Sequence, residues 1–379
     1  MNKISEKGKQ TIGFINQYFP KGQFTAKELS DACGEKVYAA TLNSIAKYGF
    51  VTNIGGSPAK YEVTSDFQNL IVDLSRSEVS KGSDNTALNK AKRVKNDEFY
   101  TRYEDIEAEV MKYKQYFKDK VVYLPCDDPV GTNDLLVTNS SFWSFFVTNF
   151  NNFGLKKLIA THYDDKGGAY KIWIDRPADG SLISNDGEEA LQVSLSGNGD
   201  FRSDECIDIL KECDIVCTNP PFSMFRDFVH TLMMYDVDFL IIGNQNAFKY
   251  KEIFPLIKDG KIWTGYNMVK KFYQPDGTLK QFGNVCWFTN LPTTKRTEPM
   301  ILTKEYSKNM NLYQKIDNYP GAINVNRLVD IPKDWTGLMG VPITYIDKHC
   351  PTQFEIVDCL VCPIVAGTEK YSRIIIQKV

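Results

Sequence analysis

Apolar positions in the first 66 residues repeat with the spacing of short amphipathic helices and then alternate as in a hairpin. The first helix is predicted by apolar residues at i, i+3 and i+7: Ile12, Ile15 and Phe19. Thr25 and Glu28 have the spacing of a capping box, which indicates the start of a second helix. A third helix over 35–48 and a turn-rich hairpin around 53–60 follow. This order is that of a winged helix, with 35–48 as the recognition helix and 53–60 as the wing.

The partner of this front module stays open between DNA and another protein. The presumed DNA face carries few basic residues, namely Lys36, Lys47 and Lys60. This small number is also compatible with a protein-binding module of the same shape. Residues 73–95 are polar and poor in large apolar side chains, so we interpret them as a linker. The basic cluster at 90–95 is either a solvated face or a segment that follows DNA phosphates.

From residue 121 onward, short apolar strands alternate with helical patterns. Strands are expected at 121–124, 158–160, 214–218, 239–242 and 285–288. A phenylalanine stripe between the first two predicts a crossover helix that ends at Gly154, and residues 170–195 read as an inserted hairpin. The pattern predicts a doubly wound α/β fold with a mostly parallel, Rossmann-like sheet. Beyond 292 the periodicity weakens, which indicates an irregular C-terminal lobe. The expected domains are 1–72, 73–95 (the linker), 96–292 and 293–379.

Composition narrows the class of protein. Hydrophobic residues make up 42% of the 379 residues, which excludes whole-chain disorder, and the net charge of −2 excludes a globally cationic nucleic-acid binder. We expect no membrane segment, because no run of eighteen apolar residues occurs. Nine cysteines and no signal-like N-terminus favour reduced thiols in the cytoplasm. Cys359 and Cys362 form a CxxC without a matching histidine pair, so we expect no metal site and interpret the cysteines as small buried side chains.

The strongest chemical signal is Asn219-Pro220-Pro221-Phe222, directly after the strand 214–218. Ligands of an open parallel sheet bind at the carboxyl ends of its strands. A tetrad of this kind presents an aromatic amine to an electrophile: the Asn219 side-chain oxygen and the Pro220 carbonyl can accept both amine hydrogens. The prolines fix the backbone, and Phe222 offers a face on which a flipped base can stack. The alternative is a plain turn from a strand into a helix.

Further segments stand in order around this tetrad: 96–101, 105–107, 126–129, 340–344 and 353–356. Together with the tetrad they resemble the EcoRI-type adenine-specific DNA methyltransferase family over roughly residues 85–379. The resemblance implies transfer of a methyl group from S-adenosylmethionine to N6 of a flipped adenine in double-stranded DNA. The motif order resembles the gamma arrangement, which implies that residues 293–379 recognise the target, with Lys295, Arg296 or Arg327 near DNA.

The same resemblance assigns cofactor-binding residues by position. Tyr100 and Thr101 would line the methionine end. Cys126, Asp127 and Asp128 stand where a glycine-rich loop is usual, and Asp127 would bind the methionine amino group. Asp200 would accept from the cofactor's adenine amine, and Phe201 would pack against its ring. The alternatives are a helix cap at 99–101, a solvated turn at 126–129 and an ordinary N-cap aspartate at Asp200.

Two other functions fit the same residues. The tetrad also serves methyltransferases that act on RNA adenine or on a protein glutamine amide. A DNA-binding regulator whose methyltransferase domain has lost turnover is the second alternative, favoured by the front module and the glycine-poor loop at 126–129. The acidic residue that binds the ribose stays unassigned. His162, His230 and His349 have no consistent partners and are interpreted as structural or surface residues.

Overall fold

The computed structural model describes residues 6–19, 21–34, 36–65, 67, 99–129, 140–184, 186–274 and 278–379. The chain divides into two compact units, residues 1–87 and 88–379, which are described separately. The whole of the expected linker 73–95 lies outside the described residues. In the part of the chain that is described, no helix is long and apolar enough to cross a membrane.

The described residues of the N-terminal unit form three helices and a three-stranded antiparallel sheet of order β1-β3-β2. Its elements are α1 (Glu6–Tyr18), β1 (Gln23–Thr25), α2 (Ala26–Cys33), α3 (Ala39–Ala46), β2 (Val51–Gly55) and β3 (Lys60–Val63). The capping box is confirmed: the Thr25 hydroxyl accepts from the Glu28 amide at 3.2 Å, and the Glu28 carboxylate accepts from the Thr25 amide at 2.7 Å. Ile15, Leu29, Leu42, Ile45 and Tyr61 are fully buried in its core. The helix expected at 35–48 is shorter than predicted, since Tyr38 is its N-cap.

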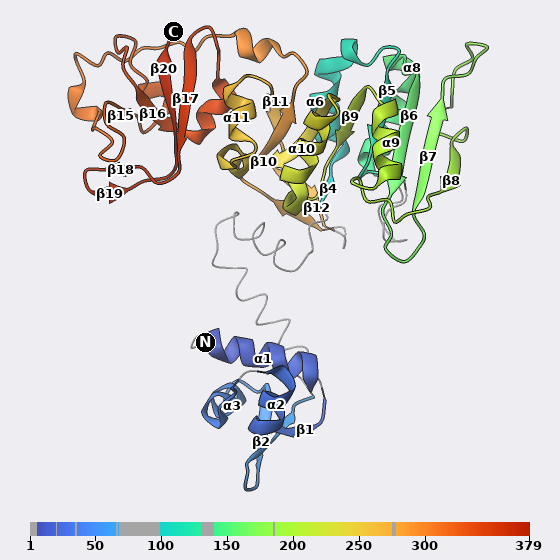
Figure 1. Cartoon of the computed structure of the whole chain (residues 1–379), viewed down its shortest axis with the longest axis vertical. Helices are drawn as coiled ribbons and strands as arrows, with labels where there is room; N and C mark the ends of the chain where they lie inside the picture. Colours follow the sequence, from blue (N-terminus) through green and yellow to red (C-terminus); the bar gives the residue numbers. More distant parts are fainter. Residues whose placement is uncertain are drawn as a thin grey trace. The chain divides into compact units, whose positions relative to one another are not determined.

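The C-terminal unit is built on an eight-stranded sheet of order β11-β14-β10-β9-β5-β6-β7-β8 (Figure 1). Its strands are, in that order, Trp263–Met268, Val285–Thr289, Asp238–Asn244, Ile215–Thr218, Val121–Leu124, Lys157–His162, Tyr170–Asp175 and Leu191–Ser194. The four central strands, β10, β9, β5 and β6, are parallel. The two strands at each edge pair antiparallel, so the sheet is mixed and not mostly parallel. An apolar run such as 285–288 indicates a strand but carries no information on its direction.

Helices cover both faces of this sheet, as the doubly wound prediction requires. Trp287 and Phe288 are neighbours on β14 and therefore point to opposite faces. Phe142 of α7 (Ser141–Thr148) contacts Trp287, and Phe225 of α10 (Phe225–Met234) contacts Phe288. The remaining helices are α6 (Tyr103–Val110), α8 (Phe150–Phe153), α9 (Asp204–Glu212), α11 (Phe254–Lys258) and the 3-10 turns η1 (Met111–Tyr116), η2 (Phe222–Met224) and η3 (Gln245–Lys249). Gly154 caps α8 with φ 62°, as expected.

A buried carboxylate, Glu109 on α6, fixes this helix to the edge of the sheet. It accepts from the backbone amides of Tyr266 and Asn267 at 2.7 Å each, from the Asn267 side chain at 2.9 Å and from the Tyr113 hydroxyl at 3.0 Å. The two amides can donate to Glu109 because β11 bulges between Thr264 and Met268, where the ladder of strand hydrogen bonds is interrupted. A Cβ on Gly265 would lie 2.1 Å from the carboxylate, so glycine is required there.

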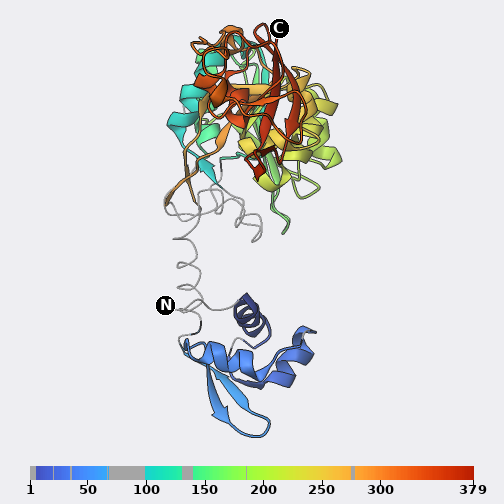
Figure 2. The same cartoon turned by 90° about the vertical axis from the view of Figure 1, so that its left-hand side faces the viewer.

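Residues 293–379 contain more regular structure than the sequence indicated. A four-stranded sheet has the order β15-β16-β20-β17, with strands Ile323–Asn324, Met339–Pro342, Arg373–Lys378 and Phe354–Leu360. A hairpin of β18 (Ile364–Val365) and β19 (Thr368–Glu369) and the turns η4 (Thr294–Thr297), η5 (Met310–Leu312), η6 (Leu328–Asp330) and η7 (Ile343–Lys348) complete it. α11 contacts β17, and one apolar core continues from α10 into these strands. Figures 1 and 2 show the red C-terminal strands beside α11.

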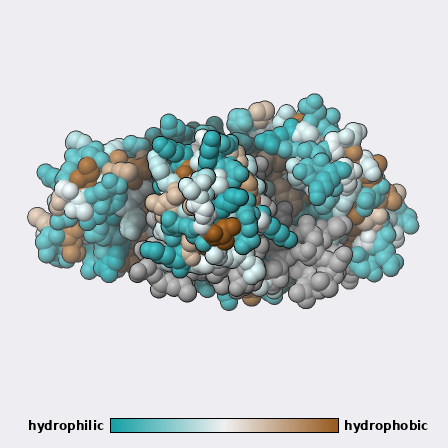
Figure 3. All heavy atoms as spheres, turned by 90° about the horizontal axis from the view of Figure 1, so that it is seen from below, coloured by the Kyte–Doolittle hydropathy of each residue, from teal (hydrophilic) through white to brown (hydrophobic). Residues whose placement is uncertain are grey.

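The surface chemistry fits a chain with most apolar residues inside. The described residues seen in Figure 3 are mainly hydrophilic on the face toward the viewer, with small separate hydrophobic spots. Among the cysteines, Cys206, Cys217, Cys286 and Cys350 are buried, which agrees with their interpretation as small core side chains. Cys362 is exposed, so that interpretation is wrong for it, because it lies in the turn after β17.

Candidate active site

The Asn219–Phe222 tetrad lies where the sequence placed it, at the carboxyl end of β9 in the middle of the parallel strands. β9 is buried along its whole length, and Pro221 begins the short turn η2 that leads into α10. The tetrad is therefore also a strand-to-helix turn, as its simpler interpretation proposed. The side-chain contacts of Asn219 decide whether it is more than that.

Asn219 is held by two hydrogen bonds, and its side-chain oxygen remains as an acceptor. Its side-chain NH2 donates to the Phe99 carbonyl at 2.5 Å, and its backbone amide donates to the Asp127 carboxylate at 2.8 Å. Because a carbonyl can only accept, the side-chain nitrogen must face Phe99, which fixes the orientation of the amide. The side-chain oxygen is buried and has no hydrogen-bond partner among the described residues. A buried acceptor without a donor costs about 1–3 kcal/mol, so the site favours a ligand that brings an N–H group.

Asp127 connects the loop after β5 to the tetrad. Its carboxylate accepts from the Thr218 hydroxyl at 2.5 Å and the Ser140 hydroxyl at 3.1 Å, in addition to the Asn219 amide. Burial raises the pKa of Asp127 to about 7, although these hydrogen bonds act in the opposite direction. Cys126 lies beside it, and burial raises the pKa of its thiol well above the usual range. A solvated turn at 126–129 is not what the structure shows, since Asp127 is 8% exposed.

Asp128 contacts residues at the end of the next strand, β6. Its carboxylate accepts from the Tyr170 hydroxyl at 2.5 Å and lies 3.2 Å from His162 Nδ1. The His162 ring stacks on Tyr170 with centroids 5.0 Å apart, and the hydrogen bond to Asp128 raises the pKa of His162. The interpretation of His162 as a residue without a partner is therefore wrong. Asp128 follows β5, and His162 ends the neighbouring parallel strand β6. Because the carboxyl ends of parallel strands lie at one edge of a sheet, the sequence could have indicated that these two side chains meet.

Asp200 and Phe201 lie in the loop before α9, next to the same edge. The Arg202 guanidinium donates to Asp200 at 2.9 and 2.6 Å and lowers the pKa of that carboxyl. Asp200 is not an N-cap, because Ser203 caps α9. Phe201 is nearly buried and packs edge-on against Phe228 at 4.9 Å. Gly199 brings the loop close: its φ is +77°, and a Cβ there would lie 2.2 Å from the His162 carbonyl oxygen.

Tyr100 and Thr101 form β4, which pairs with β12 (Lys271–Tyr273) in a small sheet completed by β13 (Leu279–Gln281). The helix-cap interpretation of 99–101 is wrong, because these residues precede α6 as a strand. Thr101 is 2% exposed, and its hydroxyl has no hydrogen-bond partner within the described ranges. Among the described residues, Thr101 and Asn219 thus each have one buried side-chain oxygen without a hydrogen-bond partner.

The Phe222 ring is more enclosed than the sequence indicated. It is 6% exposed, stacks near Phe99 with centroids 6.1 Å apart and meets Phe272 edge-on at 6.3 Å. Phe99 also contacts Phe282 at 4.8 Å. The face that we expected to be open to a flipped base is covered in this structure by the segment that also binds the Asn219 amide.

The structure thus brings most of the predicted residues to one edge of the sheet. Asn219 of the tetrad bonds to Asp127 and to Phe99, two residues before Thr101. Asp128 contacts His162, and the Asp200 loop approaches the His162 carbonyl at Gly199. His162 and Tyr170 were missed. Asp164 does not offer a free carboxylate, because it accepts from the backbone amides of Lys166 and Gly168 at 2.8 and 3.0 Å.

Comparisons with known proteins agree with this geometry. The family model for the adenine-specific methyltransferase EcoRI matches residues 87–378. The Type II methyltransferase M.EcoRI of Escherichia coli is 42% identical over 305 residues, which cover 74% of this chain and 90% of the relative. M.MpnI of Mycoplasma pneumoniae is 39% identical over 295 residues, covering 73% and 86%. M.MgeORF184P of Mycoplasma genitalium is 35% identical over 331 residues, covering 77% and 98%. No solved structure matches the chain.

The match begins after the N-terminal unit and covers the whole sheet and the C-terminal strands. Because the family model spans most of the chain and three relatives agree with it, the chain belongs to the EcoRI-type adenine-specific methyltransferase family and is a DNA adenine methyltransferase.

Proposed function

We propose that this enzyme transfers the methyl group of S-adenosylmethionine to N6 of an adenine that is flipped out of double-stranded DNA. The observation that carries the proposal is the buried Asn219 side-chain oxygen, which has no partner among the described residues while the amide nitrogen is already bound. An adenine N6 group supplies the N–H that this oxygen lacks. The Pro220 carbonyl is the proposed acceptor for the second hydrogen.

The chemistry assigned to the tetrad is orientation of the amine. The lone pair of an exocyclic adenine nitrogen is delocalised into the ring, which makes the nitrogen a weak nucleophile. Two acceptors on its hydrogens favour a pyramidal nitrogen with the lone pair directed away from them. S-adenosylmethionine, when bound, supplies an electrophilic methyl group on a sulfonium ion. No side chain at this site needs to act as a general base in the transfer itself.

The residues at the sheet edge fit this cofactor. The Thr101 hydroxyl is buried and has no partner among the residues that the structure describes. Asp128 lies in the loop after β5, and Asp200 lies in the loop before α9. We propose Tyr100, Thr101, Cys126, Asp128, Asp200 and Phe201 as its binding residues. The resemblance predicts that Asp127 binds the methionine amino group. Its bond to the Asn219 amide supports a different role, and we propose that Asp127 positions Asn219.

Base stacking on Phe222 requires a local change, because Phe99 covers this ring at 6.1 Å. The same Phe99 binds the Asn219 amide through its carbonyl. Displacement of Phe99 by an entering base would therefore both open the Phe222 ring and release the Asn219 NH2 group. Entry of the base would thus convert the tetrad in one step from the arrangement covered by Phe99 to one that holds the adenine.

We also propose functions for the parts around the catalytic sheet. The order α1, β1, α2, α3, β2, β3 supports a winged helix over 1–72, with α3 as its recognition helix. Asn43, on the exposed side of α3, accepts from Asn53 at 3.0 Å and thereby joins this helix to the wing. Residues 293–379 are proposed as the target-recognition region of the catalytic domain 96–292.

The test is product analysis with labelled S-adenosylmethionine and the full chain. Equal amounts of duplex DNA, RNA and protein extract are offered separately, and the DNA is digested to nucleosides. The proposal expects label in N6-methyl-2′-deoxyadenosine of duplex DNA, at sites that share one sequence. Label that appears only in RNA, or in a protein glutamine amide, contradicts the substrate assignment.

A further inference from the structure

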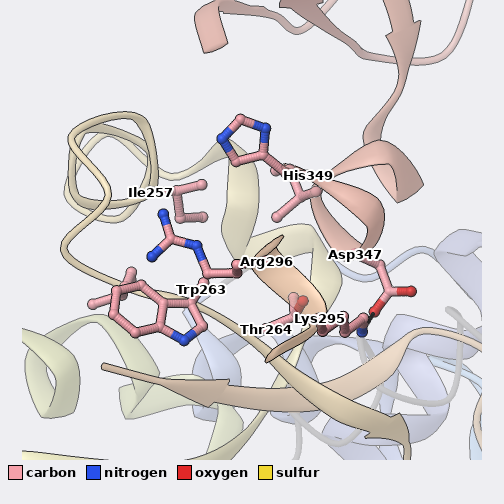
Figure 4. Close-up of a pocket in the computed structure, with 9 residues that line it drawn as sticks. Ile257, Trp263, Thr264, Lys295, Arg296, Asp347 and His349 are labelled. Carbon is pink, nitrogen blue, oxygen red and sulfur yellow. Dashed lines mark hydrogen bonds and ion pairs between the residues drawn. The ribbon is translucent and has the colours of Figure 1, made fainter. Parts of the chain in front are cut away.

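The three cations expected near DNA are not free charges at the tetrad. Lys295 and Arg327 are each ion-paired with an aspartate, and Arg296 lies over the ring of Trp263 at 4.1 Å (Figure 4). Trp263 begins β11, which runs antiparallel to β14, as β14 does to β10. β11 therefore runs in the direction of the parallel strands, and Arg296 lies at their amino end, opposite Asn219. Cations that contact DNA at the tetrad are to be found at the carboxyl end.

A β-hairpin lies at this carboxyl end, between β11 and β14. β14 begins at Val285, which pairs with Asn244, the last residue of β10. The chain that precedes β14 forms β12 and β13, which pair antiparallel, and β12 also pairs with β4 (Figure 1). This β12–β13 hairpin (residues 270–282) is therefore at the same end of the sheet as Asn219.

Two buried aromatic side chains hold the hairpin against the tetrad. Phe272 is fully buried and meets Phe222 edge-on at 6.3 Å and Phe99 at 6.4 Å. Phe282 contacts Phe99 at 4.8 Å. A base that enters beside Phe222 therefore passes this hairpin. Because a flipped nucleotide turns about its own backbone, the phosphates on either side of it stay close to the entrance.

The hairpin carries positive charge that is not neutralised by neighbouring carboxylates. Its sequence contains Lys270, Lys271 and Lys280 and a single acid, Asp276, whereas the whole chain has a net charge of −2. Within the described residues, none of the three ammonium groups forms a hydrogen bond or an ion pair. Lys271 is exposed and Lys280 is half-buried.

A carboxylate does lie within electrostatic range of Lys271. Burial raises the pKa of Asp105, and the charges of Arg102 and Lys271 act against this increase. Arg102 already donates to both Asp105 oxygens, at 2.8 and 2.9 Å. The Lys271 ammonium therefore remains available for a further anion.

The strand register places the two lysines on opposite faces of the hairpin. Lys280 pairs with Phe272, and Phe272 with Thr101, so these three side chains share the face toward the tetrad. Lys271 pairs with Gln281 and lies on the other face, because successive side chains of a strand alternate. One hairpin thus offers cations to two different phosphates.

We propose that Lys271 and Lys280 bind DNA phosphates on either side of the flipped adenine, so that the β12–β13 hairpin is a DNA-binding element of the catalytic domain. A lysine ammonium is a compact charge on a flexible stem, which suits phosphate contacts that position DNA without reading its sequence. The proposal rests on duplex DNA as the substrate. It adds a contact to the one proposed for residues 293–379.

The test is the salt dependence of duplex binding by the full chain, for the natural protein, Lys271→Gln, Lys280→Gln and the double variant. Lys261→Gln is the matched control: Lys261 is also exposed and without a hydrogen bond or ion pair among the described residues, but it precedes β11 at the amino end of the sheet. The N-terminal unit is the same in every variant, so its own contribution to binding cancels. Thermal unfolding of each variant shows that it is folded.

We expect the slope of log K against log salt to fall by about 0.9 in each single variant and by about 1.8 in the double variant. The loss of affinity should be equal for all DNA sequences. Lys261→Gln should match the natural protein. An unchanged slope in the double variant overturns the proposal.

A second measurement separates DNA from the cofactor, because Lys280 shares its face with Thr101. Calorimetry should give Lys280→Gln an affinity for S-adenosylmethionine within about threefold of the natural value. A larger loss, together with an unchanged DNA slope, would assign Lys280 to the cofactor and overturn the proposal. Absence of methyl transfer to duplex DNA by the natural protein would instead contradict the proposed function. The slopes measure binding alone and so distinguish the two failures.

Discussion

Two buried carboxylates in this enzyme, Glu109 and Asp127, show how similar burial serves different tasks. Glu109 is bound by two backbone amides of the β11 bulge and by two side chains, all of which belong to the scaffold. Asp127 is bound by two hydroxyls and by the backbone amide of Asn219, the residue proposed to orient the target amine. Removal of the Glu109 carboxylate should therefore destabilise the fold, and removal of the Asp127 carboxylate should shift the tetrad.

The largest expected effect on stability comes from Glu109→Ala. It removes the acceptor of two backbone amides and of the Tyr113 hydroxyl, and the Asn267 side chain keeps only the Ala108 carbonyl, which should lower the free energy of unfolding by about 3–5 kcal/mol. Denaturant unfolding measures it. Glu107→Ala, an exposed residue on the same helix, is the control and should change stability by less than about 0.5 kcal/mol. Equal effects of the two variants would refute the bracing role of Glu109.

Asp127→Asn should affect the reaction more than the fold. Asparagine keeps the volume but turns one acceptor into a donor that faces other donors, so Asn219 shifts. We expect kcat to fall about 10–100-fold while cofactor affinity changes by less than about threefold. Asp165→Asn, an exposed change, should leave both unaltered. Loss of cofactor affinity at unchanged kcat would show instead that Asp127 binds the methionine amino group.

A smaller effect is expected on pH dependence. The pKa of Asp127 is raised from 3.8 to about 7 by burial, so the folded state binds this proton more tightly than the unfolded chain. The stability it contributes is therefore present below about pH 4 and is lost as the pH rises through 7. Between pH 5 and 8, the natural protein should lose about 1–3 kcal/mol more than Asp127→Asn. If the free energy of unfolding changed equally with pH in the two proteins, the raised pKa of Asp127 would be contradicted.

These two carboxylates also show what a sequence reveals. The tetrad was predictable because its signal is local: a buried strand followed directly by Asn219-Pro220-Pro221-Phe222. The contact that orients the Asn219 side chain could not be predicted, because the Phe99 carbonyl that accepts from it lies 120 positions away in sequence. Glu109 gave a signal that was overlooked, since it stands on the apolar stripe of Ile106, Val110 and Tyr113, where a carboxylate needs donors.

Other differences have the same origin. The edge strands β7, β8 and β14 were predicted and β11 was not, and the antiparallel direction of all four depends on pairing that the apolar pattern does not encode. The C-terminal sheet was missed because its strands are short and depend on a core shared with α10 and α11. Gly199 looked like one glycine among many, and only the approach to the His162 carbonyl shows why it is required.

The central claim is that Asn219 acts on the target amine and not on the cofactor. The direct measurement is Asn219→Ala, with cofactor affinity from calorimetry and methyl transfer to duplex DNA from single-turnover kinetics. We expect transfer to fall by about 10³-fold or more, with the dissociation constant for S-adenosylmethionine within about threefold of the natural value. A parallel loss of both would contradict the claim, since the side chain would then only support the fold of the site.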